Sequence, residues 1–143
     1  MRSPLVLLMV ASLTAVACKP TPPVPVLKTA DGRVVDAPPP ADASAEEAAK
    51  ALASEARSLR ANGETALADG KEAELLERFP NTAAAAEIYE QRARSAAEVG
   101  ATDEAIGYYE KLLFYRPQFV RISTAREAYA KLLLDVGRPK DAA

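Results

Sequence analysis

A spacing of 37 residues recurs along the second half of this 143-residue chain and limits what it can fold into. Four sets of small or basic residues share this offset. They are Gly63, Gly100 and Gly137; Ala56, Ala93 and Ala130; Ala68, Ala105 and Ala142; and Arg57, Arg94 and Lys131. One offset shared by several sets is typical of a helical repeat in which each unit packs on the next. The spacing therefore predicts an all-α fold, a solenoid of helix-turn-helix units.

Turn residues divide each unit into two helices. A glycine ends the first helix in the left-handed conformation, and Pro80 and Pro117 end the second. Thr102 and Pro139 are expected to open the second helix, by capping or by a preset φ. The predicted helices span about 44–61, 64–78, 83–98, 102–115 and 121–136, and another begins at 139.

Composition agrees with closely packed helices and excludes several kinds of chemistry. Hydrophobic residues make up 49% of the chain, but 31 of them are Ala, and only 24 larger ones follow position 42. Such a thin core argues against a β-sandwich or a thick α/β sheet. The chain has no His and one Cys, so we expect no catalytic residues, no metal site and no cofactor. With a net charge of −2, the chain lacks the basic surface that binding to nucleic acid requires.

The first 17 residues form a predicted secretory signal peptide. Arg2 is followed by a nearly continuous apolar run from Leu5 to Val16, which is too short to span a bilayer of about 20 residues. Small residues then precede Cys18. Ordinary signal peptidase would cut after Ala17, before this cysteine.

Small residues directly before a cysteine also resemble the lipobox of bacterial lipoproteins, with Ala15 at the position where Leu is commonest. That resemblance implies that Cys18 becomes the mature N-terminus, with a diacylglycerol on its sulfur and a further acyl chain, such as palmitate, on its amine. Lys19, directly after this cysteine, resembles the residue found at that position in lipoproteins sorted to the outer membrane. The alternatives are a free thiol at the start of an exported protein, or a cysteine within an uncleaved apolar stretch.

Residues 18–43 form a predicted disordered tether. Seven of the eleven prolines fall here, which favours extended polyproline II structure with a reach of about 75 Å. A docking motif is the alternative, and Val34 and Val35 could pair with a sheet edge.

Residues 86–119 are similar to a tetratricopeptide repeat. The bulky, small and closing positions of that repeat are held by Tyr89, Ala93, Ala105, Tyr109 and Pro117. Arg92 departs from the usual Leu, and the period is 37 instead of 34. The resemblance implies units at about 49–85, 86–122 and 123–143, within a repeat region 44–143. Combined with a lipid anchor, it resembles bacterial outer-membrane lipoproteins of the BamD and YbgF type, in repeat style and anchoring.

In that family the concave groove is lined by the first helix of each unit. The matching positions here carry acid, base and acid in order, at Glu87, Glu90, Arg94 and Glu98, then at Glu127, Lys131 and Asp135. These residues would bind an extended peptide or a partner helix. The alternative is that they form ordinary i,i+4 ion pairs on solvated helices.

Apolar residues gather near the C-terminus. Tyr129, Leu132, Leu133, Leu134 and Val136 are expected to face a neighbour, which suggests self-association or partner docking through 123–143. Most aromatic residues are expected in the core, and Tyr115 or Phe119 is the candidate for an exposed anchor.

Together these features predict a lipid-anchored adaptor at the periplasmic face of the outer membrane, with protein partners in an envelope assembly. That assembly would be outer-membrane biogenesis, a secretin or pilus system, or cell-wall-linked machinery. The alternatives are a passive structural or shortened repeat lipoprotein, and a peptidoglycan enzyme that uses paired carboxylates such as Glu87 and Glu90.

Overall fold

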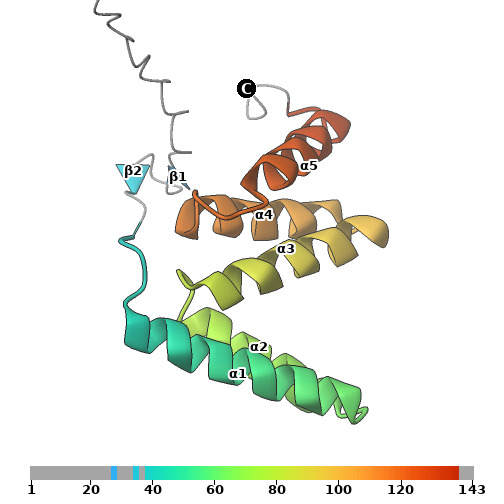
Figure 1. Cartoon of the computed structure of the whole chain (residues 1–143). Coiled ribbons are helices and arrows are strands. Elements are labelled where there is room, and N and C mark those ends of the chain that lie inside the picture. The colour runs from blue at the N-terminus through green and yellow to red at the C-terminus, as the bar shows by residue number, and fades with distance from the viewer. Residues whose placement is uncertain (1–26, 29–33, 36–37, 139–143) are drawn as a thin grey trace, which may run out of the picture.

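The computed structural model describes residues 27–28, 34–35 and 38–138 (Figure 1). The predicted signal peptide 1–17, the predicted lipidation site Cys18 and the helix expected to begin at Pro139 lie outside the described residues. Within them the chain forms five helices and two strands of two residues each. The all-α prediction is confirmed for this part of the chain.

The helices follow one another with short connections. They are α1 (Ala43–Ala61), α2 (Thr65–Arg78), α3 (Ala83–Glu98), α4 (Thr102–Tyr115) and α5 (Ile122–Asp135). Each end lies within one residue of the predicted end. Helix boundaries could be predicted this closely because Gly and Pro mark almost every turn.

The predicted glycine turns are confirmed. Gly63, Gly100 and Gly137 have φ of +81°, +77° and +73°, and they are the described residues with positive φ. This backbone conformation is energetically unfavourable for residues that have a Cβ atom. The 37-residue spacing of the glycines therefore fixes where each first helix ends.

Helix starts use polar caps at two places. Asp42 Oδ1 accepts a hydrogen bond from the Ala45 amide at 2.8 Å, and Thr82 Oγ1 accepts one from the Ala85 amide at 3.3 Å. Both residues therefore satisfy amides that the first helical turn leaves free. The hydrogen bonds to Asp42 also lower the pKa of its carboxyl group, with that from Ala45 the largest cause.

Thr102 does not cap α4, so that prediction is wrong. Thr102 is the first helical residue, and the N-cap position is held by Ala101, which has no side chain able to bond the helix. The Thr102 hydroxyl donates instead to the Gly100 carbonyl at 3.4 Å. The hydroxyl is thus used by the glycine turn.

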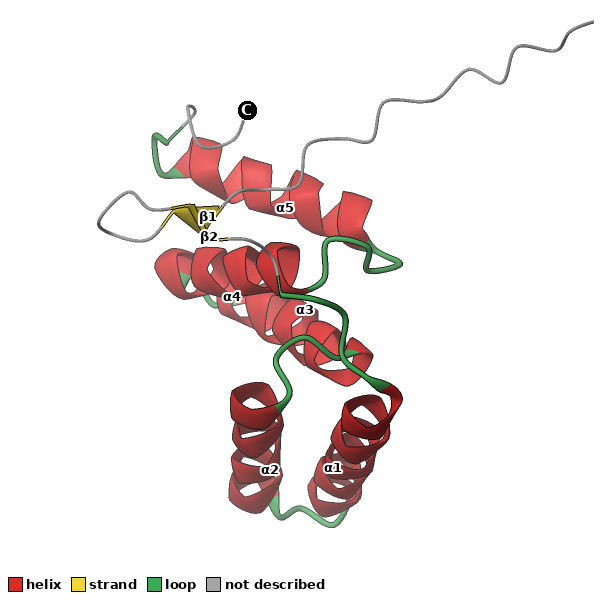
Figure 2. Cartoon of the chain, turned by 90° about the vertical axis from the view of Figure 1, so that its left-hand side faces the viewer, coloured by secondary structure: helices red, strands yellow, loops and turns green. Residues whose placement is uncertain are grey.

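The helices form two stacked hairpins and a fifth helix. α1 packs against α2, α3 packs against α4, and α5 packs mainly against α4 (Figures 1 and 2). Between the hairpins, α1 contacts α3, whereas α2 touches α3 only sparsely. The hairpins therefore meet closely at one side and diverge at the other (Figure 2).

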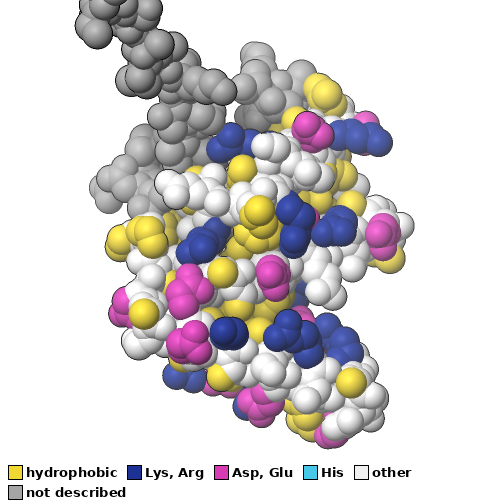
Figure 3. Space-filling model, in the orientation of Figure 1, with side chains coloured by type: hydrophobic (Ala, Val, Ile, Leu, Met, Phe, Trp, Pro, Cys, Tyr) yellow, Lys and Arg dark blue, Asp and Glu magenta, His cyan; other side chains and the backbone are white. Residues whose placement is uncertain are grey.

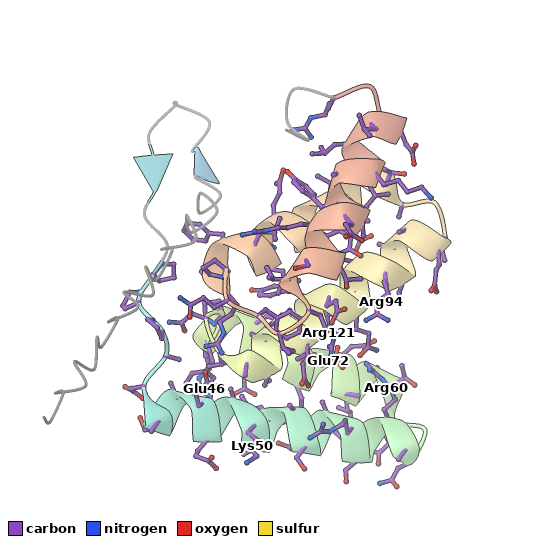
Figure 4. The ribbon with its side chains drawn as sticks, turned by 45° about the horizontal axis from the view of Figure 1, so that its top comes forward. Glu46, Lys50, Arg60, Glu72, Arg94 and Arg121 are labelled. Carbon is purple, nitrogen blue, oxygen red and sulfur yellow. The ribbon has the colours of Figure 1, made fainter. Side chains whose placement is uncertain are left out.

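Glu46 joins the hairpins where they meet closely. Its carboxylate accepts hydrogen bonds from the Ala83 amide at the start of α3, at 2.9 and 3.2 Å, and from Arg116 Nη1 at 3.0 Å. Arg116 also donates to the Asn81 carbonyl at 3.2 Å. An acidic group at a helix N-terminus is favourable because the free amides there carry partial positive charge. One side chain of α1 thus holds the beginning of α3 and the end of α4 (Figure 4).

The core is built from alanines and a few large side chains. The four repeat positions expected in the core are buried, Tyr89 and Tyr109 at 3% exposure and Ala93 and Ala105 at 0%. Alanines let helix backbones approach closely, and the large residues fill the space beside them. Fully buried large side chains come from α2, α4 and α5, namely Leu75, Leu112 and Leu133.

Neither aromatic anchor candidate stands free on the surface. Phe119 is buried in the core cluster, and Tyr115 is half-buried with its ring stacked on Tyr89 at 6.2 Å between centroids. Both residues lie at or just after the end of α4, and both side chains pack in or against the core.

A short antiparallel strand pair interrupts the predicted tether. β1 (Leu27–Lys28) pairs with β2 (Val34–Val35), with Leu27 opposite Val35 and Lys28 opposite Val34. Val34 and Val35 do pair, but their partners are Lys28 and Leu27 of the same segment and not the edge of a separate sheet. Two-stranded pairs of this length are marginally stable alone.

The glycine turns give a matched test of the repeat. Gly100→Ala should lower the free energy of unfolding by about 1–2 kcal/mol, because a Cβ atom at positive φ is strained. Gly107 lies inside α4 with open space around it, so Gly107→Ala should raise that free energy by about 0.5–1 kcal/mol. Chemical denaturation measures both, and equal effects of the two substitutions would contradict the assigned turn.

Candidate functional site

Helix α3 lies between two hollows of the surface. The first, the α3–α5 hollow, has a volume of about 460 Å³ and is lined by Glu87, Glu90, Gln91, Arg94, Ser95, Glu98 and Arg121. The second, the α2–α3 cleft, has a volume of about 700 Å³ and lies where the hairpins diverge. Gln91 and Ser95 line both, so these two residues form the ridge between them.

The structure brings together one half of the predicted groove. The four predicted residues of α3, Glu87, Glu90, Arg94 and Glu98, all line the α3–α5 hollow. The three predicted residues of α5 do not line it, although all are exposed; they are Glu127, Lys131 and Asp135. The hollow is therefore a feature of α3 and the beginning of α5.

Glu90 is the buried centre of this hollow. Its side chain is only 4% exposed, and Arg94 Nη2 donates to its Oε1 at 2.8 Å. Arg121, at the N-cap position of α5, donates from Nε to Oε2 at 2.7 Å. Both arginines keep about half of their side-chain surface exposed. Glu90 thus joins α3 to α5 and is more than an i,i+4 partner of Arg94.

The two arginines keep Glu90 ionised. Burial would raise the pKa of its carboxyl group, but hydrogen bonds and charge from Arg121, and then from Arg94, outweigh burial and lower the pKa below 4.5. Glu87 is exposed on the next turn of α3. The pKa of Glu90 is therefore shifted in the opposite direction from that of the general acid of a glycan hydrolase.

The hollow exposes two carboxylates, two neutral side chains and the two arginines of the Glu90 cluster. Glu87 and Glu98 are exposed, and among the described residues neither forms an ion pair. Gln91 and Ser95 add an amide and a hydroxyl. Since Glu90 can neutralise only one of its two arginines, the alternating charges of the sequence become a rim of two acidic groups around a centre with one net positive charge.

Arg121 was not predicted from the sequence as part of this site. It lies 31 residues after Glu90 and beyond a turn, so no local spacing links the two. The usable signal was the repeat itself, because a repeat places the start of one first helix beside the middle of the preceding one. A basic residue at that start could then have been matched to Glu90.

A second carboxylate, Glu72, spans the α2–α3 cleft (Figure 4). Glu72 accepts from Arg60 Nη1 at 2.8 Å and from Arg92 Nη2 at 3.1 Å, which ties α2 to the end of α1 and to α3. The other terminal nitrogen of Arg60, Nη2, donates to Asp69 Oδ1 at 2.6 Å. Arg92 also lies over the ring of Tyr108 at 6.0 Å.

These contacts explain the residue that departs from the tetratricopeptide pattern. Burial would lower the pKa of Arg92, but its interactions with Tyr108 and Glu72 outweigh burial and raise the pKa above the ordinary value of an arginine. Arg92 therefore stays charged and serves as a polar link where the pattern would have Leu.

The described part of the chain offers neither a metal site nor a membrane-spanning helix. No group of three or more Cys, Asp or Glu there could hold a metal ion. None of the described helices is long and apolar enough to cross a membrane.

On the face seen in Figure 3, Lys and Arg side chains are interspersed with Asp and Glu side chains.

No protein-family model matches the chain, and no curated protein or solved structure shows a significant similarity to it.

The Glu90 cluster predicts a specific loss of stability in acid. Since its pKa is lowered by folding, the contribution of Glu90 is present above the unfolded pKa, near 4.5, and is lost as pH falls through the lower folded pKa. Glu90→Gln should lower the free energy of unfolding by about 1–2 kcal/mol at neutral pH. It should also flatten the pH dependence below about pH 4.5.

Glu87→Gln is the matched control, because Glu87 is exposed on the same helix. Urea denaturation at several pH values should show little change for this variant. Equal effects of the two substitutions would show that Glu90 has no special role.

Proposed function

We propose that this protein is a lipid-anchored adaptor that faces the periplasm from the bacterial outer membrane and binds partner proteins of an envelope assembly. The α3–α5 hollow is the observation that carries the proposal. It combines the Glu90 centre, whose two arginines are about half exposed, with the exposed carboxylates Glu87 and Glu98 of α3. Helix-pair surfaces of this kind suit polypeptide ligands.

The tetratricopeptide-like character of the repeat supports an adaptor. The glycine turns, buried alanines and stacked hairpins are consistent with such a repeat and support the proposal. Where tetratricopeptide units continue as a solenoid, the first helices line one face, and here α3 supplies six of the seven residues of the hollow.

The anchor is proposed from the sequence of the leader. Cys18 follows an apolar run and small residues, and acyl chains on it would hold the protein at the membrane. The proline-rich segment from Lys19 to Ala43 would then set the distance of the helices from the bilayer. In this proposal the two features would hold the hollow in the periplasm, within reach of envelope machinery.

The chemistry of the hollow favours a polypeptide with basic side chains. Glu87 and Glu98 lie eleven residues apart on α3, a separation of about 16 Å along the helix. Basic groups of an extended peptide or a helix could meet both carboxylates, while Gln91 and Ser95 bond its polar groups.

Cross-linking in intact cells, followed by mass spectrometry, tests the proposal. The expected result is one stoichiometric envelope protein whose cross-links map to α3, and an acylated N-terminal Cys18 in the same sample. Reversing the rim with Glu87→Lys and Glu98→Lys should reduce the yield at least tenfold. The fold should be retained because both residues are exposed.

Glu77→Lys is the control, since Glu77 is an exposed carboxylate of α2 outside the hollow. Cross-links that persist in the rim variant, or that disappear equally in the control, would contradict binding at the hollow. A Cys18 that carries no lipid would contradict the anchor independently.

A further inference from the structure

The repeat assigns equivalent positions to α1, α3 and α5, and one stripe of residues differs in exposure among them. In α3 this stripe is buried at Ala86, Glu90 and Ala93 and half-buried at Ala97. In α1 the equivalent stripe is buried at Ala49 and Ala56 and half-buried at Ala53 and Arg60. In these helices the stripe faces neighbouring helices.

In α5 the same stripe is open. Ser123 and Glu127 are exposed, Ala130 is half-buried, and Leu134 is 58% exposed. Glu127 is the equivalent of Glu90, but no described residue forms an ion pair with it. Lys131 is the equivalent of Arg94 and is exposed on the next turn. Helix α5 lies at one end of the stack of described helices (Figure 1).

The apolar content of this face is smaller than the sequence suggests. Leu133 is 0% exposed, and Tyr129 and Leu132 pack against the core. Tyr129 also donates to Glu110 of α4 at 3.1 Å. Of the five residues expected to face a neighbour, only Leu134 and Val136 are exposed, so charge must specify much of any association.

Charge excludes a head-to-tail stack of copies. Continuing the repeat with a second chain would place its α1 beside α5, with the equivalent of Arg121 opposite Glu127. That equivalent is Glu47, which is exposed and contacts only Lys50, at 3.7 Å. Two carboxylates would then meet where the α3–α5 contact has a carboxylate and an arginine.

An antiparallel pair of α5 helices brings the two exposed opposite charges of this face together. Glu127 and Lys131 are one turn apart, so a two-fold axis midway between them places each opposite the other of the second copy. The same axis sets Leu134 opposite Thr124 and Asp135 opposite Ser123, all of which are exposed.

We propose that the open stripe of α5 is a dimerisation surface for a second copy of this chain, paired antiparallel through Glu127 and Lys131. One helix from each copy gives a small interface, so the dimer is weak and depends on protein concentration and salt. The pairing uses neither the lipid anchor nor the α3–α5 hollow, so it stands apart from the proposed function.

Sedimentation equilibrium of the purified full-length protein in neutral detergent tests this pairing. The wild type should form dimers with increasing concentration. Glu127→Lys and Lys131→Glu should each weaken the dimer at least tenfold, because like charges then meet twice across the axis. Combining the two substitutions should restore it, since the charges are exchanged but still complementary.

Glu47→Lys is the control and should leave the dimer unchanged. Stronger association of this variant would favour the head-to-tail stack and overturn the proposal. A wild type that stays monomeric up to millimolar concentration would overturn it, as would a double variant as weak as the single ones. Circular dichroism confirms that each variant is folded, since all three positions are exposed.

Discussion

Three ion-paired carboxylates connect the helix pairs of this chain, and the arrangement of the fold depends on them. Glu46 links α1 to the beginning of α3 and the end of α4, Glu72 links α2 to α1 and α3, and Glu90 links α3 to α5. Alanines make up five of the eleven buried residues of the core cluster, and each of them buries little area. Hydrogen-bonded carboxylates are therefore a large part of what fixes one hairpin against the next.

The candidate site follows from this mode of connection. Glu90 pairs with both nearby arginines, and its bond to Arg121 holds α3 to α5, while Glu87, Glu98, Gln91 and Ser95 are exposed beside the half-exposed arginines. A residue that looks like part of a binding groove in the sequence thus serves the fold, and its neighbours supply the surface. At α5 the equivalent Glu127 lacks such a partner among the described residues, which is why the same repeat produces an open face there.

Most of the helical framework could be predicted because it depends on local chemistry. Glycine at positive φ and proline after each second helix fix the ends of the helices, and the alanine periodicity fixes which faces are buried. The i,i+4 pair of Glu90 with Arg94 was among the expected alternatives, but the partners of Glu46, Glu72 and Glu90 on other helices were not predicted, since they lie 12 to 70 residues away. The β1–β2 pair and the burial of Leu133 likewise depend on contacts that no local pattern encodes.

The role of the three carboxylates is tested most directly by native-state hydrogen exchange of the full-length chain and a Glu46→Gln, Glu72→Gln, Glu90→Gln variant. In the wild type, the slowest amides of α1 to α4 should exchange with one common free energy of opening. In the variant, amides within each hairpin should stay protected, while α1–α2 and α3–α4 open with different free energies. A uniform loss of protection in all helices, or unchanged exchange, would contradict the account.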